Sequence, residues 1–536
     1  MKNIVLLSDG TGNSAAKLFR TNVWRLYQGL DLTDEKKQVA YYDDGVGSSS
    51  FRPLALLGGA FGWGLKRNVI DLYTFLCRNY KDGDRIYCFG FSRGAFTIRI
   101  LTGVVNNQGL VRAGSEEKLR EEATAAFERY RNVWKHWTRG MGKAKRRIKK
   151  SALGEPRKES AKSAAGAPDV HFVGLWDTVA AYGLPIAGLT HALSFVVPLS
   201  VPDRNPCPIV RRACHALALD DERRTFHPVL WNEHDLPARH RRDAANIRDE
   251  MISQVWFAGM HSDVGGGYAE EQLALTTLDW MIGEARGLEF DPEALERLRA
   301  AMNVNGMLHD SRNGSGQIYR YLPRRMDKLV KDIDDPENQV IIERPKIHES
   351  VFRRIANSDD SYAPIVLPAH YAVVDVRGGI HDLPTTRPSP SPAFMLESSG
   401  EAQERLAQQK PVWDLVQSVR WLYVLSALVA LALVTFRWWP GAAATRCGGD
   451  WQCWPEKAIR WIGSWFPNFL EPWFAAYASW PIAFAVLVVA LWLLLKRSAL
   501  VRLRIKDRMR AIWLRKGVPA AASAVKSAEV ATRPRP

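Results

Sequence analysis

The sequence predicts an α/β fold, a mostly parallel sheet flanked by helices, followed by a two-helix transmembrane hairpin. Short apolar strands alternate with helical stretches through the N-terminal half of the chain, and this alternation is typical of a parallel sheet with active groups at the carboxyl ends of its strands. Two long uncharged stretches near the C-terminus predict the hairpin. At 536 residues, the chain is longer than one compact domain usually is.

The first expected elements follow from apolar runs and the residues that bound them. An apolar run predicts a strand at Asn3–Ser8, which leads into a loop at Asp9. The next expected elements, in order, are a helix over Thr21–Leu30 capped by Thr21, a strand over Gln38–Asp43, an amphipathic helix over Leu65–Tyr80 and a strand over Arg85–Phe89.

The later part of the expected sheet is more widely spaced. Val170–Trp176 and Ser253–Met260 read as strands, and helices are expected within 270–303. Between these strands, 178–250 is rich in Pro, His and Arg. We expect this stretch to be loop-rich and to form a lid or a substrate wall.

A G-x-S-x-G motif, Gly90-Phe91-Ser92-Arg93-Gly94, joins the strand Arg85–Phe89 to a helical stretch, Ala95–Val105. At such a corner the serine is forced into strained backbone angles, and its hydroxyl is exposed at the carboxyl end of the sheet. The two glycines fit a place where strand and helix approach closely. This context predicts that Ser92 is a nucleophile in a fold of the α/β-hydrolase type.

A serine nucleophile needs a base and a carboxylate that orients the base. In this type of fold the order along the chain is serine, acid, histidine. Asp177 directly follows the strand Val170–Trp176, and His261 directly follows Ser253–Met260. Both strand-end placement and chain order therefore predict the triad Ser92, Asp177 and His261.

Two other catalytic arrangements were weighed. Asp263 and His348 also follow Ser92 in the required order, but they fit the strand ends less well. The start of the chain, LSDGT, resembles the motif of aspartyl-phosphate phosphatases, but Leu7 stands where that mechanism needs its nucleophilic aspartate. The Ser92–Asp263–His348 set therefore stays open, whereas the phosphatase mechanism is excluded.

An oxyanion hole requires backbone amides that point at the developing negative charge. We expect one amide from Arg93, directly after the nucleophile, and a second from Gly10 or Thr11 after the first strand. The six cysteines show no C-x-x-C spacing typical of a metal site. No metal or cofactor is expected.

The net charge of +16 is concentrated in two segments. Thr138–Lys162 holds ten Lys and Arg against two Glu, and Lys496–Lys516 holds nine against one Asp. Basic segments of this kind bind nucleic acid or an anionic membrane surface. No nucleic-acid-binding motif accompanies them, so we expect the membrane surface as the partner and no nucleic acid.

Two apolar stretches are candidates for membrane spans. Trp421–Phe436 has 16 uncharged residues and Pro472–Leu495 has 24, and a spanning helix needs about 20. The positive-inside rule places the basic tail, and with it the N-terminal domain, in the cytoplasm, with a bacterial inner membrane as the expected location. The loop between the spans would then face the opposite side, where Cys447 and Cys453 can form a disulfide.

These observations give an expected domain map. The N-terminus, with an apolar run of only a few residues, does not read as a signal peptide. The expected parts are a hydrolase domain over 1–380 with a basic, partly mobile insertion at 113–168, a linker over 381–415, a transmembrane hairpin over 416–497 with its loop at 437–471, and a basic cytoplasmic tail over 498–536.

Five motifs in order carry a family resemblance: SDGTGN, GFSRGAFT, GLWDTV, ALDDERRTF and HSDVGGGY. Together they resemble the α/β-hydrolase domain family that includes the catalytic domains of type VI secretion lipase effectors, over roughly residues 1–350. The resemblance implies an α/β-hydrolase fold and phospholipase activity through a Ser-Asp-His triad. By motif, it also places the nucleophile at Ser92, the acid at Asp177 and the base at His261.

The sequence therefore predicts a membrane-anchored serine hydrolase that cleaves a carboxylic ester, of a lipid or phospholipid, through an acyl-enzyme. The alternative of another class is a catalytically inactive membrane scaffold that keeps the hydrolase shell and binds through its basic surfaces. A serine-directed fluorophosphonate probe separates the two, because labelling requires an activated serine.

Overall fold

The computed structural model describes residues 1–10, 19–45, 59–144, 166–179, 207–233, 236, 243–326, 340, 342, 344–357, 362–387, 392–438 and 453–515. The chain divides into two compact units. The larger unit is built mainly from Met1–Tyr319 and Pro323–Leu406, and the smaller mainly from Ala407–Ile512. Each is described here by itself.

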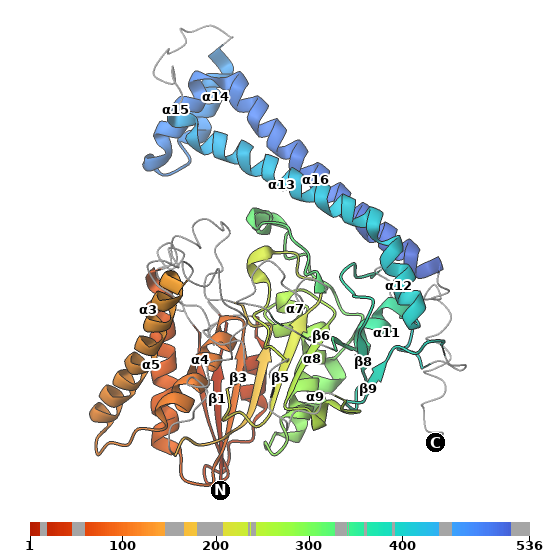
Figure 1. Ribbon diagram of the computed structural model, residues 1–536. Helices are drawn as coiled ribbons and strands as arrows, with labels where there is room; N and C mark the ends of the chain where they lie inside the picture. Colours follow the sequence, from red (N-terminus) through yellow and green to blue (C-terminus); the bar gives the residue numbers. More distant parts are fainter. Residues whose placement is uncertain are drawn as a thin grey trace. The chain divides into compact units, whose positions relative to one another are not determined.

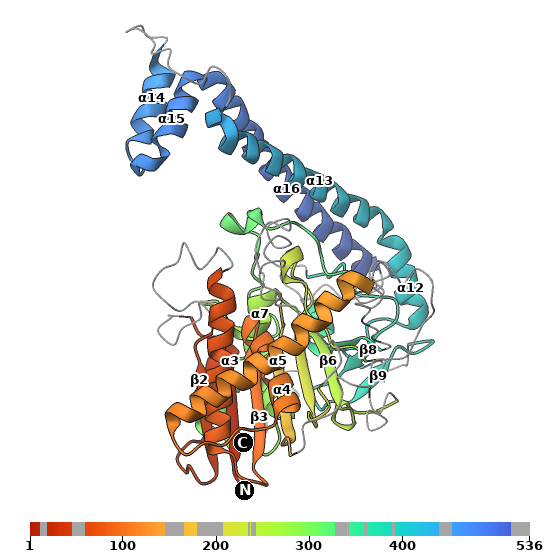
Figure 2. The ribbon, with the colours of Figure 1, turned by 60° about the vertical axis from the view of Figure 1, so that its left-hand side comes forward.

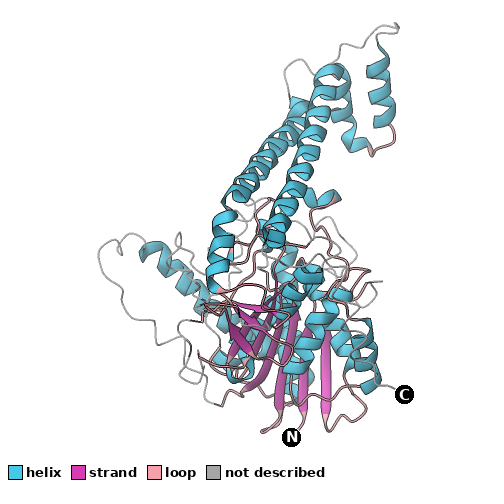
Figure 3. Ribbon diagram, turned by 90° about the vertical axis from the view of Figure 1, so that its right-hand side faces the viewer, coloured by secondary structure: helices cyan, strands magenta, loops and turns pink. Residues whose placement is uncertain are grey.

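The larger unit is organised around one sheet, whose described part has nine strands in the order β2-β1-β3-β4-β5-β6-β7-β8-β9 (Figures 1 and 3). The strands are β1 (Asn3–Ser8), β2 (Gln38–Asp43), β3 (Arg85–Phe91), β4 (Val170–Trp176), β5 (Ala213–Ala218), β6 (Ile252–Phe257), β7 (Lys346–His348), β8 (Ala372–Val374) and β9 (Ile380–Asp382). All neighbouring pairs are parallel except β8 and β9, which are antiparallel. The expected mostly parallel α/β sheet is confirmed.

Helices cover both faces of this sheet. One face packs against α3 (Gly59–Asn79), α4 (Arg93–Gln108) and α5 (Glu116–Ala144), which come forward in Figure 2. The other face packs against α1 (Asn22–Gly29) and α8 (Gln272–Glu284). The other α-helices in the described part of this unit are α7 (His261–Gly265), α9 (Pro292–Ala301), α11 (Glu349–Asn357) and α12 (Ser399–Gln408).

The order of the strands positions the functional site. Strand order reverses between β1 and β3, because β2 lies on one side of β1 and all later strands lie on the other. Ligands of open α/β sheets bind beyond the carboxyl ends of the strands at such a reversal. Ser92 directly follows β3, and Asp177 directly follows the neighbouring strand β4. The two residues are therefore brought to the same edge of the sheet.

The region expected to be loop-rich, 178–250, contains a central strand. β5 pairs with β4 on one side and β6 on the other, so the loop prediction was wrong there. Its sequence, ACHALA, is rich in alanine, which has low strand propensity. Burial between two neighbouring strands outweighs this local preference. Residues 180–206, a large part of the stretch 178–250 that was expected to form a lid or a substrate wall, lie outside the described residues.

The first half of the expected insertion is part of the core. α5 packs against α3 and α4, and Ala123, Ala126 and Phe127 are buried in the cluster that covers the sheet. The basic stretch that follows, residues 145–165, lies outside the described residues. The expected linker also contains structure, because α12 lies within it.

The smaller unit consists of two long helices and shorter ones that follow the first. The helices are α13 (Lys410–Thr435), α14 (Trp454–Gly463), α15 (Glu471–Ser479) and α16 (Pro481–Arg515), of which α16 ends in the larger unit. Two helices in the described part of the chain, Lys410–Trp438 and Pro481–Arg515, are long and apolar enough to cross a membrane. These are the two expected candidate spans.

The second apolar run, Pro472–Leu495, was expected to form one helix but does not. It is divided between α15 and α16, because Trp480 leaves the helical conformation just before Pro481, and proline cannot donate a hydrogen bond to the preceding turn. α15 instead packs at the end of α13. Trp473 Nε1 and Tyr477 Oη donate hydrogen bonds of 2.7 and 2.8 Å to the carbonyls of Val434 and Leu433, which satisfy the last turn of that helix.

The cysteines divide as the sequence suggested. Cys77, Cys88, Cys207 and Cys214 are free thiols of the larger unit. Cys453 is disulfide-bonded, and Cys447, its expected partner, lies outside the described residues.

Candidate active site

Ser92 stands at the corner between β3 and α4 with strained backbone angles, φ 58° and ψ −118°. Such angles are rare for a residue with a side chain and cost about 1–3 kcal/mol. The turn is possible because of two glycines. A Cβ at Gly90 would lie 2.7 Å from the backbone of Ala95, and one at Gly94 would lie 2.0 Å from the carbonyl oxygen of Ser8. The helix that carries Ser92 therefore packs directly on the end of β1.

Asp177 is the other non-glycine residue with positive φ among the described residues, at 37°. Its carboxylate is fully buried and accepts four hydrogen bonds. Oδ1 accepts from the Ala218 amide at 3.0 Å and from Arg324 Nη1 at 2.6 Å. Oδ2 accepts from Arg324 Nη2 at 2.8 Å and lies 2.5 Å from His261 Nδ1. A carboxylate held in this way cannot rotate.

His261 begins the short helix α7 after β6, and its imidazole lies between Ser92 and Asp177. Its Nε2 lies 2.8 Å from Ser92 Oγ, opposite the Nδ1 contact with Asp177. Its own amide donates to Asp221 Oδ2 at 3.2 Å, and the rings of Phe91 and Phe226 pack on the imidazole with centroids 4.7 and 5.0 Å away. The ring is thereby fixed in position as well as hydrogen-bonded at both nitrogens.

The protonation of these groups follows from burial and charge. Burial would raise the pKa of Asp177, but the charge of Arg324 and the hydrogen bonds from His261 and Arg324 outweigh it and hold the pKa well below its usual range. Burial lowers the pKa of His261 below its ordinary value, and the contact with Asp177 only partly opposes this shift. At neutral pH the site therefore holds an ionised carboxylate and a neutral imidazole, which can accept a proton.

The glycines after His261 serve close packing. A Cβ at Gly265 would lie 2.0 Å from the ring of Phe91, and one at Gly266, where φ is +83°, would lie 2.8 Å from the backbone of Asn22. Only glycine allows α7 to approach β3 and α1 so closely. Gly265 and Gly266 thus allow the helix that begins at His261 to reach the end of β3.

The expected oxyanion-hole residues lie at two places. Arg93 is the first residue of α4, directly after Ser92, and the first amides of a helix have no acceptor within it. The amide of Gly10 donates to Asp9 Oδ1 at 2.6 Å, so in this conformation it serves the loop itself. Thr11 lies outside the described residues. Asp9 is buried and also accepts from Thr21 and Tyr42, which makes it a structural support of that loop.

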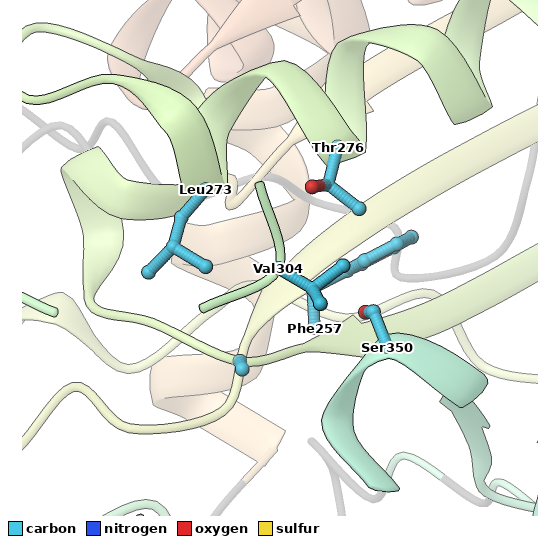
Figure 4. Close-up of a pocket in the computed structure, with 6 residues that line it drawn as sticks. Phe257, Leu273, Thr276, Val304 and Ser350 are labelled. Carbon is cyan, nitrogen blue, oxygen red and sulfur yellow. The ribbon is translucent and has the colours of Figure 1, made fainter. Parts of the chain in front are cut away.

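The structure does not bring the alternative pair together. Asp263 accepts from the amide of Met260 at 2.9 Å and lies 2.6 Å from His309 Nδ1. His348 ends β7, where its Nδ1 lies 2.9 Å from Ser350 Oγ and its ring stacks on Phe257. Phe257 and Ser350 line a small cavity there (Figure 4). Burial lowers the pKa of His348 to about 3, so this histidine is a neutral core residue.

Two residues were missed in the sequence: Arg324 contacts Asp177 of the candidate triad, whereas His309 contacts Asp263. Arg324 and His309 both come from a region without a readable pattern, and neither adjoins a recognisable motif. A buried arginine can be inferred only when its carboxylate partner is known, and partners far apart in the chain are not visible in a single sequence. Among the described residues, no group of three or more His, Cys, Asp or Glu side chains is arranged to hold a metal ion.

Comparison with known proteins gives three findings. The family model described as the type VI secretion system (T6SS) phospholipase effector Tle1-like catalytic domain matches residues 2–284. Uncharacterized protein YEL023C of Saccharomyces cerevisiae is 31% identical over 243 residues, which cover 43% of this chain but only 33% of the yeast protein. The crystal structure of an uncharacterized protein from Pseudomonas aeruginosa is similar at 19% identity and a TM-score of 0.31, over 55% of this chain and 48% of that one.

Proposed function

The chain belongs to the Tle1-like phospholipase effector catalytic domain family, and from this premise we propose that it is a membrane-anchored serine hydrolase. Its substrate is a carboxylic ester of a lipid or phospholipid, which the family description favours. The observation that carries the mechanism is the position of His261, with Nε2 at 2.8 Å from Ser92 Oγ and Nδ1 at 2.5 Å from Asp177 Oδ2. The strained corner at Ser92 supports a fold of the α/β-hydrolase type.

The proposed reaction has two steps. Ser92 Oγ attacks the ester carbonyl carbon while His261 Nε2 takes its proton, and the tetrahedral intermediate collapses as His261 returns that proton to the departing alcohol. Water then attacks the acyl-enzyme, with His261 again as the base, and releases the carboxylic acid and free Ser92. Asp177 keeps the imidazole tautomer with Nε2 unprotonated and stabilises the imidazolium that forms in each step.

The negative charge on the substrate oxygen would be stabilised by amides at the start of α4. The amide of Arg93 and the positive end of the helix dipole both lie beside Ser92. A second donor from the loop after β1 would require the Gly10 amide to turn away from Asp9, to which it donates here. Substrate binding would then reorganise this loop.

Membrane anchoring forms the second part of the proposal. The two candidate spans and the basic charge after the second support an integral membrane protein with the catalytic domain and tail in the cytoplasm. The disulfide at Cys453 supports an oxidising environment for the loop between the spans. Lipid esters would then reach the catalytic domain from the adjacent membrane.

The test uses the full-length protein in detergent with a fluorophosphonate probe and a soluble short-chain ester. Ser92→Ala should abolish labelling and hydrolysis without lowering the unfolding temperature, because the hydroxyl contributes chemistry rather than packing. Ser418→Ala is a matched control, since this exposed hydroxyl bonds only to a carbonyl of its own helix, that of Asp414. A chain that is not labelled, or that is labelled equally after Ser92→Ala, would instead be a binding scaffold or use another nucleophile.

A further inference from the structure

Arg324 contacts Asp177, the acid of the candidate triad. It lies outside the region matched by the family model, which ends at residue 284. Its side chain is fully buried. Nη1 and Nη2 donate in parallel to the two oxygens of Asp177, at 2.6 and 2.8 Å. The same two nitrogens also donate to the backbone carbonyls of Ala218 and Phe226. One guanidinium thus joins the acid of the triad to the last residue of β5 and to the segment that follows this strand.

We propose that Arg324 is a positioning residue of the triad, which locks the Asp177 carboxylate in place and lowers the pH at which His261 becomes an active base. This inference rests on the proposed function. In a triad without such a cation, the aspartate has its full negative charge available to stabilise the imidazolium. Here a buried positive charge is paired with that carboxylate, so protonation of His261 is less favourable.

The geometry supports the positioning role. Asp177 has a positive φ, and its carboxylate is held by Ala218, His261 and Arg324. The two parallel bonds from Arg324 fix the plane of the carboxylate, as such bidentate pairs do. The plane then determines where Oδ2 meets His261 Nδ1. Lysine has a single ammonium and cannot reproduce this planar fork.

Arg324 is the cation that faces Asp177, whereas the cation that faces His261 itself is Arg223, which, besides burial, lowers the pKa of that histidine. Besides Arg324, the titratable and charged groups that face Asp177 and His261 are Asp221, Arg223 and His215. Asp221 and Arg223 neutralise each other in a pair of their own, at 2.6 Å. Burial lowers the pKa of His215 to about 3, so that it is uncharged at neutral pH. Loss of Arg324 would therefore leave the negative charge of Asp177 unbalanced beside His261.

The test measures the rate of fluorophosphonate labelling against pH in the full-length protein. Arg324→Gln should move the acidic limb of this profile upward by about one to two pH units. A shift of this size is expected when one unit charge near His261 is removed in a medium of effective dielectric constant about 20. At an acidic pH on this limb, labelling relative to its plateau should fall about 10- to 100-fold. Arg324→Lys should keep the limb near its wild-type position but lower the plateau, because it restores the charge and not the fork.

A second buried arginine provides a matched control. Arg405 bonds both oxygens of the buried Glu397 and the carbonyls of Leu367 and Pro368, an arrangement of the same kind with no contact to the triad. Arg405→Gln should lower stability and leave the acidic limb unmoved. An unmoved limb in Arg324→Gln, with only a lower plateau, would reduce Arg324 to a structural residue and overturn the proposal. A wild type that is not labelled at any pH would overturn the proposed function itself.

A second measurement does not depend on activity. Asp177→Asn leaves the Arg324 guanidinium buried beside a neutral partner, which is strongly unfavourable. Removing the charge as well, in Asp177→Asn with Arg324→Met, should therefore raise the unfolding temperature above that of Asp177→Asn alone. If the double variant unfolds at a lower temperature than the single one, the two side chains are not coupled as proposed.

Discussion

Gly94→Ala tests whether the position of the corner at Ser92 depends on direct backbone contact. Gly94 lies in the first turn of α4, where an added Cβ would stand 2.0 Å from the carbonyl oxygen of Ser8 and 2.5 Å from that of Asp9. Both neighbours are backbone atoms, and Ser8 is held in β1, which pairs on both sides. A side-chain rotation cannot relieve this overlap, so α4 itself must move.

The expected magnitude follows from the size of the overlap. An ordinary contact between a carbon and an oxygen atom is about 3.3 Å or longer, so α4 and β1 must separate by roughly 1 Å. Overpacking of this kind costs about 1–3 kcal/mol in stability. Ser92 and the Arg93 amide move with the helix, and a misplacement of about 1 Å at a reacting group lowers the rate about 10²-fold. The loss of turnover should therefore exceed what the loss of stability explains.

The assay compares thermal unfolding, turnover of a soluble ester and fluorophosphonate labelling in the full-length protein. Gly114→Ala is the matched control, because an added Cβ there meets no atom within 4 Å. It should retain wild-type activity and unfolding temperature. A Gly94→Ala variant that also retained both would refute the close approach of α4 to β1, and with it the reason why the motif ends in a glycine.

Further predictions concern the base, its titration, the topology and the basic segment. His261→Ala should lower ester turnover about 10²- to 10⁴-fold, as loss of a general base does, and His348→Ala should leave it nearly unchanged; the reverse result would make His348 the base. The base must be neutral to act, and burial lowers the pKa of His261, so kcat/KM should rise with pH through a midpoint below 6.5. A midpoint above 6.5 would contradict the buried surroundings of His261. In sealed cells after mild reduction, an impermeant thiol reagent should label only Cys447 and Cys453, whereas labelling of any other cysteine would reverse the proposed orientation. Deleting 140–162 should weaken binding to anionic vesicles, as added salt should, since about 0.1 M salt screens charges beyond about 10 Å. Unchanged binding would reject the role of this basic segment in membrane binding.

The sequence by itself determined the elements whose pattern is local. The strand at Gln38–Asp43 and that at Val170–Trp176 have the bounds that their apolar runs predicted. Thr21 caps the first helix, where its Oγ1 accepts from the Trp24 amide. The corner at Ser92 was also readable, because a glycine–serine–glycine spacing between a strand and a helix has few other structural explanations. Each of these inferences needs only residues that are neighbours in the chain.

Where the pattern was not local, only the tertiary structure decided. β5 has a weak strand sequence and exists because β4 and β6 enclose it. The division of the apolar run 472–495 is different, because Pro481 was a local signal within a continuous apolar composition. The sequence offered two acids and two histidines for one serine, and the structure sets only Asp177 and His261 beside Ser92. Arg324 had no signal at all. Its partner lies 147 positions earlier in the chain, and a buried charge is recognised only by the opposite charge that the fold places against it.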